Sequence, residues 1–266
     1  MSTIELVDPE LRDALAQWPL LPLTAESLTR RRANALELLG GVPKPHLPDI
    51  ATNEIHVESA FGAKPIRVLT YRPVTSDDPL PVIVHIHGGG FVMGAPEMKD
   101  VENRLFASEL KCAIYSVDHR LAPEAPHPAP LEDIYSVFAW LHANAGQLGL
   151  DPARIGIKGE SGGGGFAAAA ALYARDRQGP KFAFQHLIYP MIDDRTARCA
   201  RTYILTSASS SGRKRTTISA GVRCSARSRA QPTSRLMRRL HEQRICRACL
   251  QPTFRSAVLI SSSKKT

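Results

Sequence analysis

The stretch KGESGGGGF, residues 158–166, places one serine, Ser161, among glycines. It follows the apolar run ARIGI (153–157) and leads into an alanine-rich segment, so it predicts a strand, a sharp turn and a helix. In the pattern G-x-S-x-G, small neighbours allow a tight turn that lifts the serine oxygen above a sheet, where it can act as a nucleophile. The alternative interpretation is a glycine-rich turn that only packs a helix closely against a strand.

A second glycine cluster, HIHGGGFVMG (85–94), favours the catalytic interpretation. Acyl transfer passes through a tetrahedral oxyanion that needs N–H donors about 3 Å away, and glycines let a backbone loop come that close. We expect the oxyanion donors to be the N–H groups of Gly89, Gly90 and Gly162. Four further residues are expected to support the two motifs: His87, Gly88, Gly159 and Glu160.

The chain around these motifs alternates strand-like and helix-like segments. Strands are expected at 80–87, 112–119, 153–159 and 182–190, with helices at 97–111, 131–141 and 162–177 between them. This order predicts an α/β fold with a mostly parallel central sheet and helices on both faces. Upstream, 53–59 and 66–73 predict a hairpin, and residues 1–45 are typical of two capped helices.

Four segments together resemble one known family: HGGGF, DHRLAPEAPHPAPLED (118–133), DPARIGIKGESGGG (151–164) and LIYPMIDDR (187–195). They are similar to the α/β-hydrolase esterases of the hormone-sensitive lipase-like group. The resemblance implies an N-terminal helical cap (1–50) and a hydrolase core (51–194). It also implies hydrolysis of small-molecule carboxylic esters with small or medium acyl chains, with Ser161 as nucleophile and no metal or cofactor.

The charge of the chain changes abruptly near residue 195. Residues 1–194 carry 17 Lys and Arg against 24 Asp and Glu, whereas residues 195–266 carry 17 against one. The second part also holds only two of the 18 glycines, and it has no sustained periodicity. Two hypotheses explain this: a divergent basic tail that is disordered, or the product of a shifted reading frame. In either case the C-terminal strands and helix of the fold are expected to be missing or disordered.

The same region should hold the acid and the base of the catalytic triad, because the hydrolase order is serine, acid, histidine. Only His186 and His241 follow Ser161. His186 lies inside an expected strand and is interpreted as a core or sheet residue, and His241 precedes a glutamate directly, in the reversed order. Asp193 and Asp194 resemble a loop of the family and not its triad acid. The acid and base are therefore left unassigned, and we expect the activity of this chain to be impaired.

Two features of the tail bear on functions other than ester hydrolysis. The tail residues Cys224, His241, Cys246 and Cys249 are too irregularly spaced to predict a zinc site. The basic tail supports an alternative function, a non-catalytic hydrolase-like protein that binds anions or nucleic acid, although it contains no specific nucleic-acid motif. No apolar run approaches the roughly 20 residues of a membrane span, and the first residues do not resemble a signal peptide, so we expect a cytoplasmic protein. The oligomeric state stays open.

Overall fold

The computed structural model describes residues 7–17, 24–40, 44 and 46–193. Their strands form one sheet in the order β1-β2-β4-β3-β5-β6. The strands are β1 (Ile50–Val57), β2 (Ile66–Pro73), β3 (Leu80–Ile86), β4 (Ala113–Val117), β5 (Leu150–Glu160) and β6 (Gln185–Ile188). Strand β2 runs antiparallel to both β1 and β4, and the other neighbouring pairs are parallel. The expected hairpin and the mostly parallel sheet are therefore confirmed.

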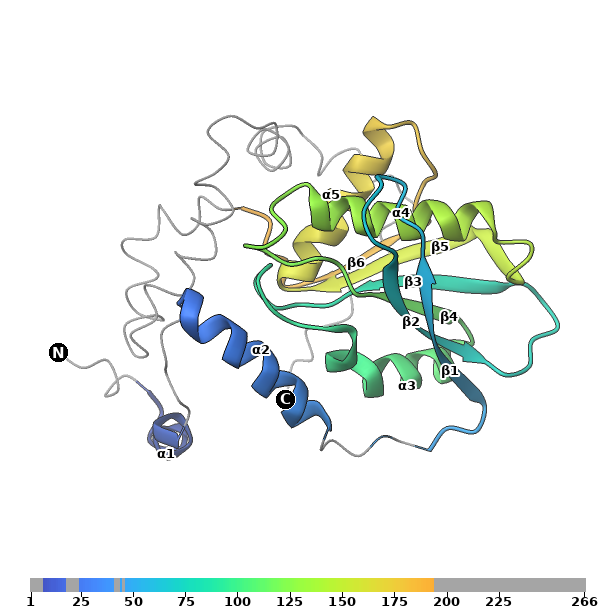
Figure 1. The fold of residues 1–266 in the computed structure, drawn as a ribbon. Helices are drawn as coiled ribbons and strands as arrows, with labels where there is room; N and C mark the ends of the chain where they lie inside the picture. The colour runs from blue at the N-terminus through green and yellow to red at the C-terminus, as the bar shows by residue number, and fades with distance from the viewer. Residues whose placement is uncertain (1–6, 18–23, 41–43, 45, 194–266) are drawn as a thin grey trace.

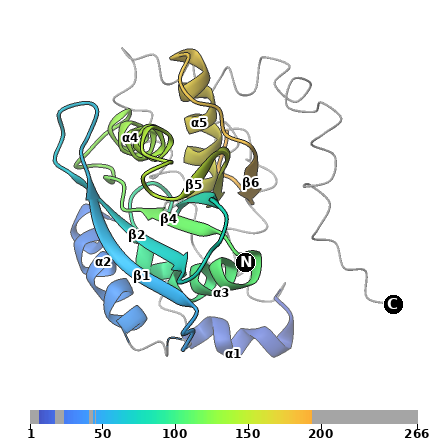
Figure 2. The same cartoon turned by 90° about the vertical axis from the view of Figure 1, so that its right-hand side faces the viewer.

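Helices cover both faces of the sheet, as expected (Figures 1 and 2). Helix α3 (Asp100–Leu110) lies on one face, and α4 (Ala129–Ala143) and α5 (Gly162–Asp176) lie on the other. A short 3-10 helix, η2 (Pro96–Lys99), precedes α3, so the helix predicted to begin at 97 starts as a tighter turn. Strand β6 is shorter than the predicted 182–190. Two N-terminal helices, α1 (Pro9–Gln17) and α2 (Ala25–Gly40), correspond to the predicted cap.

The core has two parts because the central strands are buried on both faces. On β3, Val82, Val84 and Ile86 pack with residues of α4 and α5, whereas Ile83 packs in a smaller cluster with Ala107 of α3. A strand covered on both sides reads as a continuous apolar run, which explains the pattern of residues 80–86. Toward the end of β3 the face covered by α3 is no longer apolar, because the polar His85 is completely buried there.

The register of β3 and β5 brings the two glycine motifs together. Ile86, the last residue of β3, lies opposite Gly159 of β5, so both loops leave the sheet at the same edge. A Cβ atom at Gly163, in the first turn of α5, would overlap the backbone oxygens of Ile86 and His87. The absence of a side chain therefore lets α5 begin directly against the end of β3.

The cap helix α2 docks on the segment that follows the first glycine loop. The Arg32 guanidinium donates to the carbonyl oxygens of Val92 (2.8 Å) and Ala122 (2.9 Å) and forms a two-point ion pair with Glu124. Leu28, one turn earlier on α2, is buried in a small cluster with Val92 and Ala122. This contact joins the N-terminal segment to the loops at the edge of the sheet.

A matched pair of glycine substitutions tests the close approach of α5 to β3. Gly163→Ala is expected to lower the free energy of unfolding by roughly 1–3 kcal/mol, because the new methyl group forces the two backbones apart. Gly146→Ala is the control, since a Cβ at this exposed turn would meet no atom within 4 Å. Its effect should stay within about 0.5 kcal/mol. Denaturant unfolding measures both, and equal effects would contradict the packing described here.

Candidate active site

Ser161 occupies a strained turn between β5 and α5. Its backbone angles are φ 54° and ψ −120°, a conformation that side-chain-bearing residues rarely adopt and that clusters at functional sites. The turn is held from β6 and the residues after it: the Ser161 N–H donates to the Ile188 carbonyl (3.0 Å), and the Ser161 carbonyl accepts from the Met191 N–H (2.9 Å). Ser161 is only partly buried, so it can meet a molecule from solvent.

The triple-glycine loop lies directly beside this turn. A Cβ placed on Gly88 would lie 3.5 Å from the Ser161 Cβ, and one placed on Gly162 would lie 3.1 Å from the Gly90 nitrogen and 3.0 Å from the Phe91 nitrogen. Two of the predicted oxyanion donors, the N–H groups of Gly90 and Gly162, thus belong to backbones in close contact. The first N–H groups of a helix lack partners within the helix, which makes the start of α5 suited to bind an anion.

Gly89, the third predicted donor, shapes the loop. Its φ of +129° favours glycine, and a Cβ there would overlap the carbonyl oxygen of Met93. The Gly89 carbonyl accepts the N–H groups of Val92 (3.2 Å) and Met93 (3.1 Å), which closes the chain into a turn. The loop is thus a defined turn and not an open, flexible segment.

His87 lies behind this turn. Its imidazole stacks on that of His119, with centroids 4.3 Å apart and planes 11° from parallel, and its Nδ1 donates to the Gly88 carbonyl at 2.9 Å. Burial lowers the pKa of both rings, so both are neutral near pH 7. His87 can therefore support the glycine loop from behind, the role that the sequence predicts for it.

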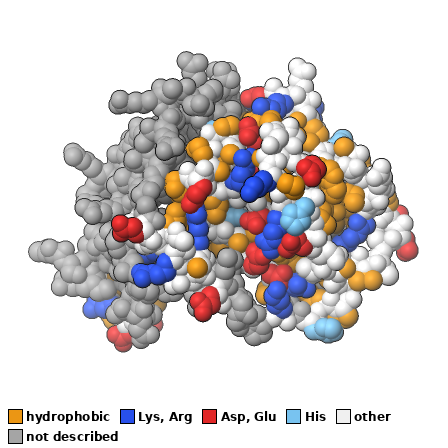
Figure 3. All heavy atoms as spheres, viewed as in Figure 1, with side chains coloured by type: hydrophobic (Ala, Val, Ile, Leu, Met, Phe, Trp, Pro, Cys, Tyr) orange, Lys and Arg blue, Asp and Glu red, His pale blue; other side chains and the backbone are white. Residues whose placement is uncertain are grey.

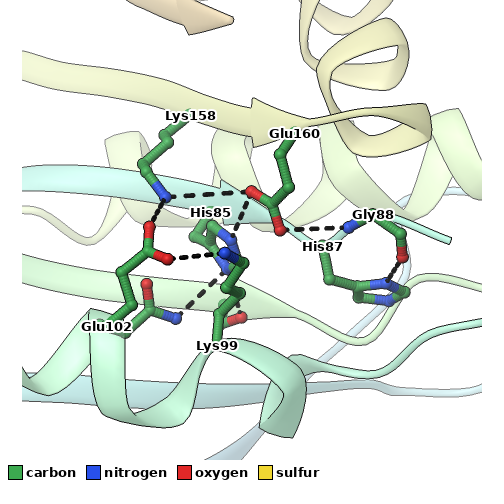
Figure 4. Close-up of polar contacts among 9 residues, drawn as sticks. His85, His87, Gly88, Lys99, Glu102, Lys158 and Glu160 are labelled. Carbon is green, nitrogen blue, oxygen red and sulfur yellow. Dashed lines mark hydrogen bonds and ion pairs between the residues drawn. The ribbon is translucent and has the colours of Figure 1, made fainter. Parts of the chain in front are cut away.

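Glu160, next to Ser161, connects the two motifs. Its side chain is buried, with one carboxylate oxygen accepting the Gly88 N–H (3.3 Å) and the other facing His85 Nε2 (3.3 Å), as Figure 4 shows. The predicted supporting role of Glu160 thus has a specific geometry, because the residue directly before Ser161 binds the glycine loop through its carboxylate. A Cβ at Gly159 would overlap the Gly163 carbonyl, so this position favours glycine for the same reason as Gly163.

No base for Ser161 is identified among the described residues. Within residues 7–17, 24–40, 44 and 46–193, the hydrogen bonds of the histidine side chains go to partners other than the Ser161 hydroxyl. His186 is confirmed as a sheet residue, in β6 opposite Lys158, although it is exposed and not part of the core. Asp194, His241 and the cysteines considered for zinc lie outside the described residues. In the part of the chain that is described, no three His, Cys, Asp or Glu side chains gather to hold a metal ion.

Ion pairs hold the proline-rich segment after β4 against two helices. Glu124 pairs with Arg32 of α2 and not with the nearby His127. Arg120 forms a two-point contact with the buried Asp133 of α4, with the shortest N–O distance 2.7 Å. Both pairs hold the segment against neighbouring helices, and neither resembles a base with its carboxylate partner.

Sequence reasoning missed Lys158, which is 1% exposed and lies two residues before Glu160 on the same face of β5. Its ammonium contacts Glu102 of α3, another residue that sequence reasoning did not single out. The alternation of β5 places Lys158 and Glu160 on one side of the strand, but it does not show that α3 covers that side. Among the described helices, none combines the length and apolar character needed to cross a bilayer.

Comparison with known proteins agrees with this geometry. Residues 83–254 match a family model described as alpha/beta hydrolase fold, a match that extends past residue 195. Carboxylesterase NlhH of Mycobacterium tuberculosis is 38% identical over 184 residues, which are 69% of this chain and 57% of that protein. An arylesterase of Saccharolobus solfataricus is 32% identical over 65% of this chain and 56% of that protein. The chain thus spans just over half the length of these relatives.

Solved structures show the same relationship. A structure titled Bacterial Heroin Esterase superposes with a TM-score of 0.69 at 32% identity and covers 83% of this chain and 68% of its own. Esterase LipW from Mycobacterium marinum superposes with a TM-score of 0.64 at 30% identity, covering 87% and 72%. The family match, the serine turn beside the glycine loop and these esterase neighbours lead to one conclusion: the chain belongs to the α/β-hydrolase fold family and to an esterase lineage within it.

Proposed function

We propose that the protein is a serine carboxylesterase in which Ser161 is the nucleophile and the N–H groups of Gly89, Gly90 and Gly162 bind the oxyanion. The observation that carries this proposal is the contact between the serine turn and the glycine loop, with the Gly90 nitrogen 3.1 Å from the Cβ position of Gly162. Donors preorganised in this way stabilise charge that develops in the transition state, and removal of one such donor typically costs ~10²–10³ in rate.

The reaction would follow the acyl-enzyme route. The Ser161 oxygen attacks the ester carbonyl while its proton passes to a base, and the tetrahedral oxyanion collapses with loss of the alcohol, which takes that proton. Water then attacks the acyl-enzyme, its proton again passes to the base, and the carboxylic acid and free Ser161 are released. In the hydrolase order the acid and the base follow the serine, and neither is assigned in this chain. If neither group is present, the oxyanion hole alone would leave a residual ~10³–10⁴ over water, as it does in other serine hydrolases.

The likeness to a carboxylesterase and an arylesterase supports an ester substrate. We propose a small molecule with a short or medium acyl chain. Residues 1–194 give less support to a non-catalytic protein that binds nucleic acid. They carry seven more acidic than basic residues (24 against 17). On the face shown in Figure 3, the acidic and basic side chains are interspersed. Phosphate backbones are bound by gathered positive charge.

Ser161→Ala tests the nucleophile. Hydrolysis of a short-chain nitrophenyl ester should fall to the background rate, and a fluorophosphonate probe should no longer label the protein, because the attacking oxygen is gone. Ser76→Ala is the matched control, since Ser76 is exposed and bonds only to the nearby Asp78 carbonyl. Equal rates for the wild-type protein and Ser161→Ala would favour the non-catalytic alternative.

His186→Ala tests whether the base lies elsewhere. The side chain shares a face of the sheet with its partner Lys158 and is exposed, so the labelling rate of Ser161 should stay within about twofold. The second-order rate of fluorophosphonate labelling is the measurement. A loss of roughly 100-fold or more would identify His186 as the base and overturn its interpretation as a sheet residue.

A further inference from the structure

A row of charged residues lies behind the glycine loop, on the face of the sheet covered by α3 (Figure 4). Lys158 and Glu160 are buried, and Glu102 and Lys99 are partly exposed. The Lys158 ammonium contacts Glu102 at 2.7 Å and lies 3.9 Å from the Glu160 carboxylate. Glu102 also accepts from Lys99 at 2.6 Å. Glu160 in turn accepts a hydrogen bond from the Gly88 N–H, so this series of charged contacts leads to the glycine loop.

The burial of Lys158 and Glu160 costs free energy, so the presence of these charges in the core needs an explanation. Lys158 is 1% exposed and Glu160 5%, and an ion is expensive to remove from water unless it is paired. The ammonium also lies 5.1 Å from the centre of the Phe106 ring, whose face attracts cations. An apolar residue would fill this core-facing position of β5 without the desolvation cost, so a structural role alone does not account for a lysine here.

Hydrogen bonds around His85 show which form of Glu160 the site requires. His85 Nδ1 lies 2.8 Å from the Ser116 hydroxyl and 3.3 Å from the Asn103 amide nitrogen. Because the amide nitrogen can only donate, Nδ1 accepts, and the imidazole proton is on Nε2. Nε2 then donates to one oxygen of Glu160 while Gly88 donates to the other. Both oxygens accept, which only the ionised carboxylate does fully.

The charges facing Glu160 favour that ionised form. Burial raises the pKa of Glu160, but the hydrogen bond from His85 and the charges of Lys158 and Lys99 outweigh it, so this pKa is lowered overall. Burial likewise raises the pKa of Glu102, and its bonds from Lys158 and Lys99 bring it down to about 2. Burial lowers the pKa of His85, which faces Glu160 from β3, and that of His87 at the end of the same strand.

We propose that Lys158 is a positioning residue for the oxyanion hole: its ammonium holds Glu160 as a carboxylate, and that carboxylate fixes the Gly88 N–H and hence the glycine loop opposite Ser161. This inference rests on the proposed function for its catalytic consequence. Protonation of Glu160 would take away one acceptor and release either Gly88 or His85. Reactivity of Ser161 should therefore fall as the pH drops through the pKa of Glu160, and loss of the nearby cation should move that fall to higher pH.

Three variants separate a positioning role of Lys158 from a contribution of this residue to the stability of the fold. Lys158→Met removes the buried cation, and Lys181→Met makes the same change at an exposed site after α5. The double variant Lys158→Met with Glu102→Gln also removes the carboxylate that loses one of its two lysine partners, so it should recover part of the stability that the single variant loses. A role limited to packing predicts that the reactivity of Ser161 recovers together with stability, whereas positioning predicts that it does not.

The first measurement is the pH profile of Ser161 labelling by a fluorophosphonate. In both Lys158 variants the acid limb should move up by roughly one pH unit, because an opposite charge at this distance lowers a carboxyl pKa by about that much or more. At a pH between the two limbs, labelling should slow by up to about tenfold, the factor that one pH unit gives for a single titrating group. The Lys181→Met profile should match the wild type. An unshifted limb, or full recovery in the double variant, overturns the proposal.

The second measurement does not depend on activity. Amide hydrogen exchange of residues 87–91 should quicken at least tenfold in both Lys158 variants, while residues 131–141 of α4 in the double variant exchange as in the wild type. Unchanged exchange at 87–91 overturns the positioning role. If the wild-type protein neither labels nor hydrolyses esters, the proposed function fails, and this exchange result still decides whether Lys158 holds the loop.

Discussion

The parallel contact between the ends of β3 and β5 determines where the groups of the site lie. Ile86 is opposite Gly159, so the glycine loop and the serine turn leave the sheet side by side. The backbones come so close that a side chain on Gly163 would overlap the Ile86 carbonyl. Glycine at this position is therefore a steric requirement of the junction, and the junction places backbone N–H groups beside a strained, accessible serine.

Behind this edge the core is polar where a doubly covered sheet would ordinarily be apolar. Strand β5 keeps Ile155 and Ile157 in the main core, but on the opposite face it buries Lys158 and Glu160. Ion pairs of this kind rarely stabilise a fold more than apolar residues of similar size would, because desolvation offsets the attraction. What they supply here is a hydrogen bond of defined direction, since the Glu160 carboxylate binds the Gly88 N–H and an apolar side chain could not.

The N-terminal cap is attached to the same region from the outside. Arg32 binds the backbone at Val92 and Ala122, and Val92 comes two residues after the triple glycine. The glycine loop is thus bound from two sides. Glu160 binds its Gly88 N–H from the face covered by α3, and Arg32 of α2 binds the Val92 carbonyl just after it. A loop whose N–H groups must point at a small target gains rigidity from contacts on both sides, because misplacement of such donors weakens them steeply.

Much of this architecture is determined locally and could be predicted. The order of strands and helices, the hairpin, the serine turn and the glycine loop follow from apolar periodicity and from the short-range geometry of glycine. Element ends were less predictable: the helix predicted from 97 begins as the 3-10 helix η2, and β6 is short. The acid and base stay unassigned because the pattern of the chain changes near residue 195.

The tertiary structure alone decided which polar residues act together. Lys158, Glu102 and Glu160 are charged residues on β5 and α3, and in the sequence each could equally face solvent. Only the packing of α3 against the sheet brings them together, with Lys158 and Glu160 buried and Glu102 partly exposed, and the fold aims the Glu160 carboxylate at Gly88. Periodicity shows which side of a strand a residue occupies, but it cannot show which element covers that side, because that depends on contacts between residues far apart in the chain.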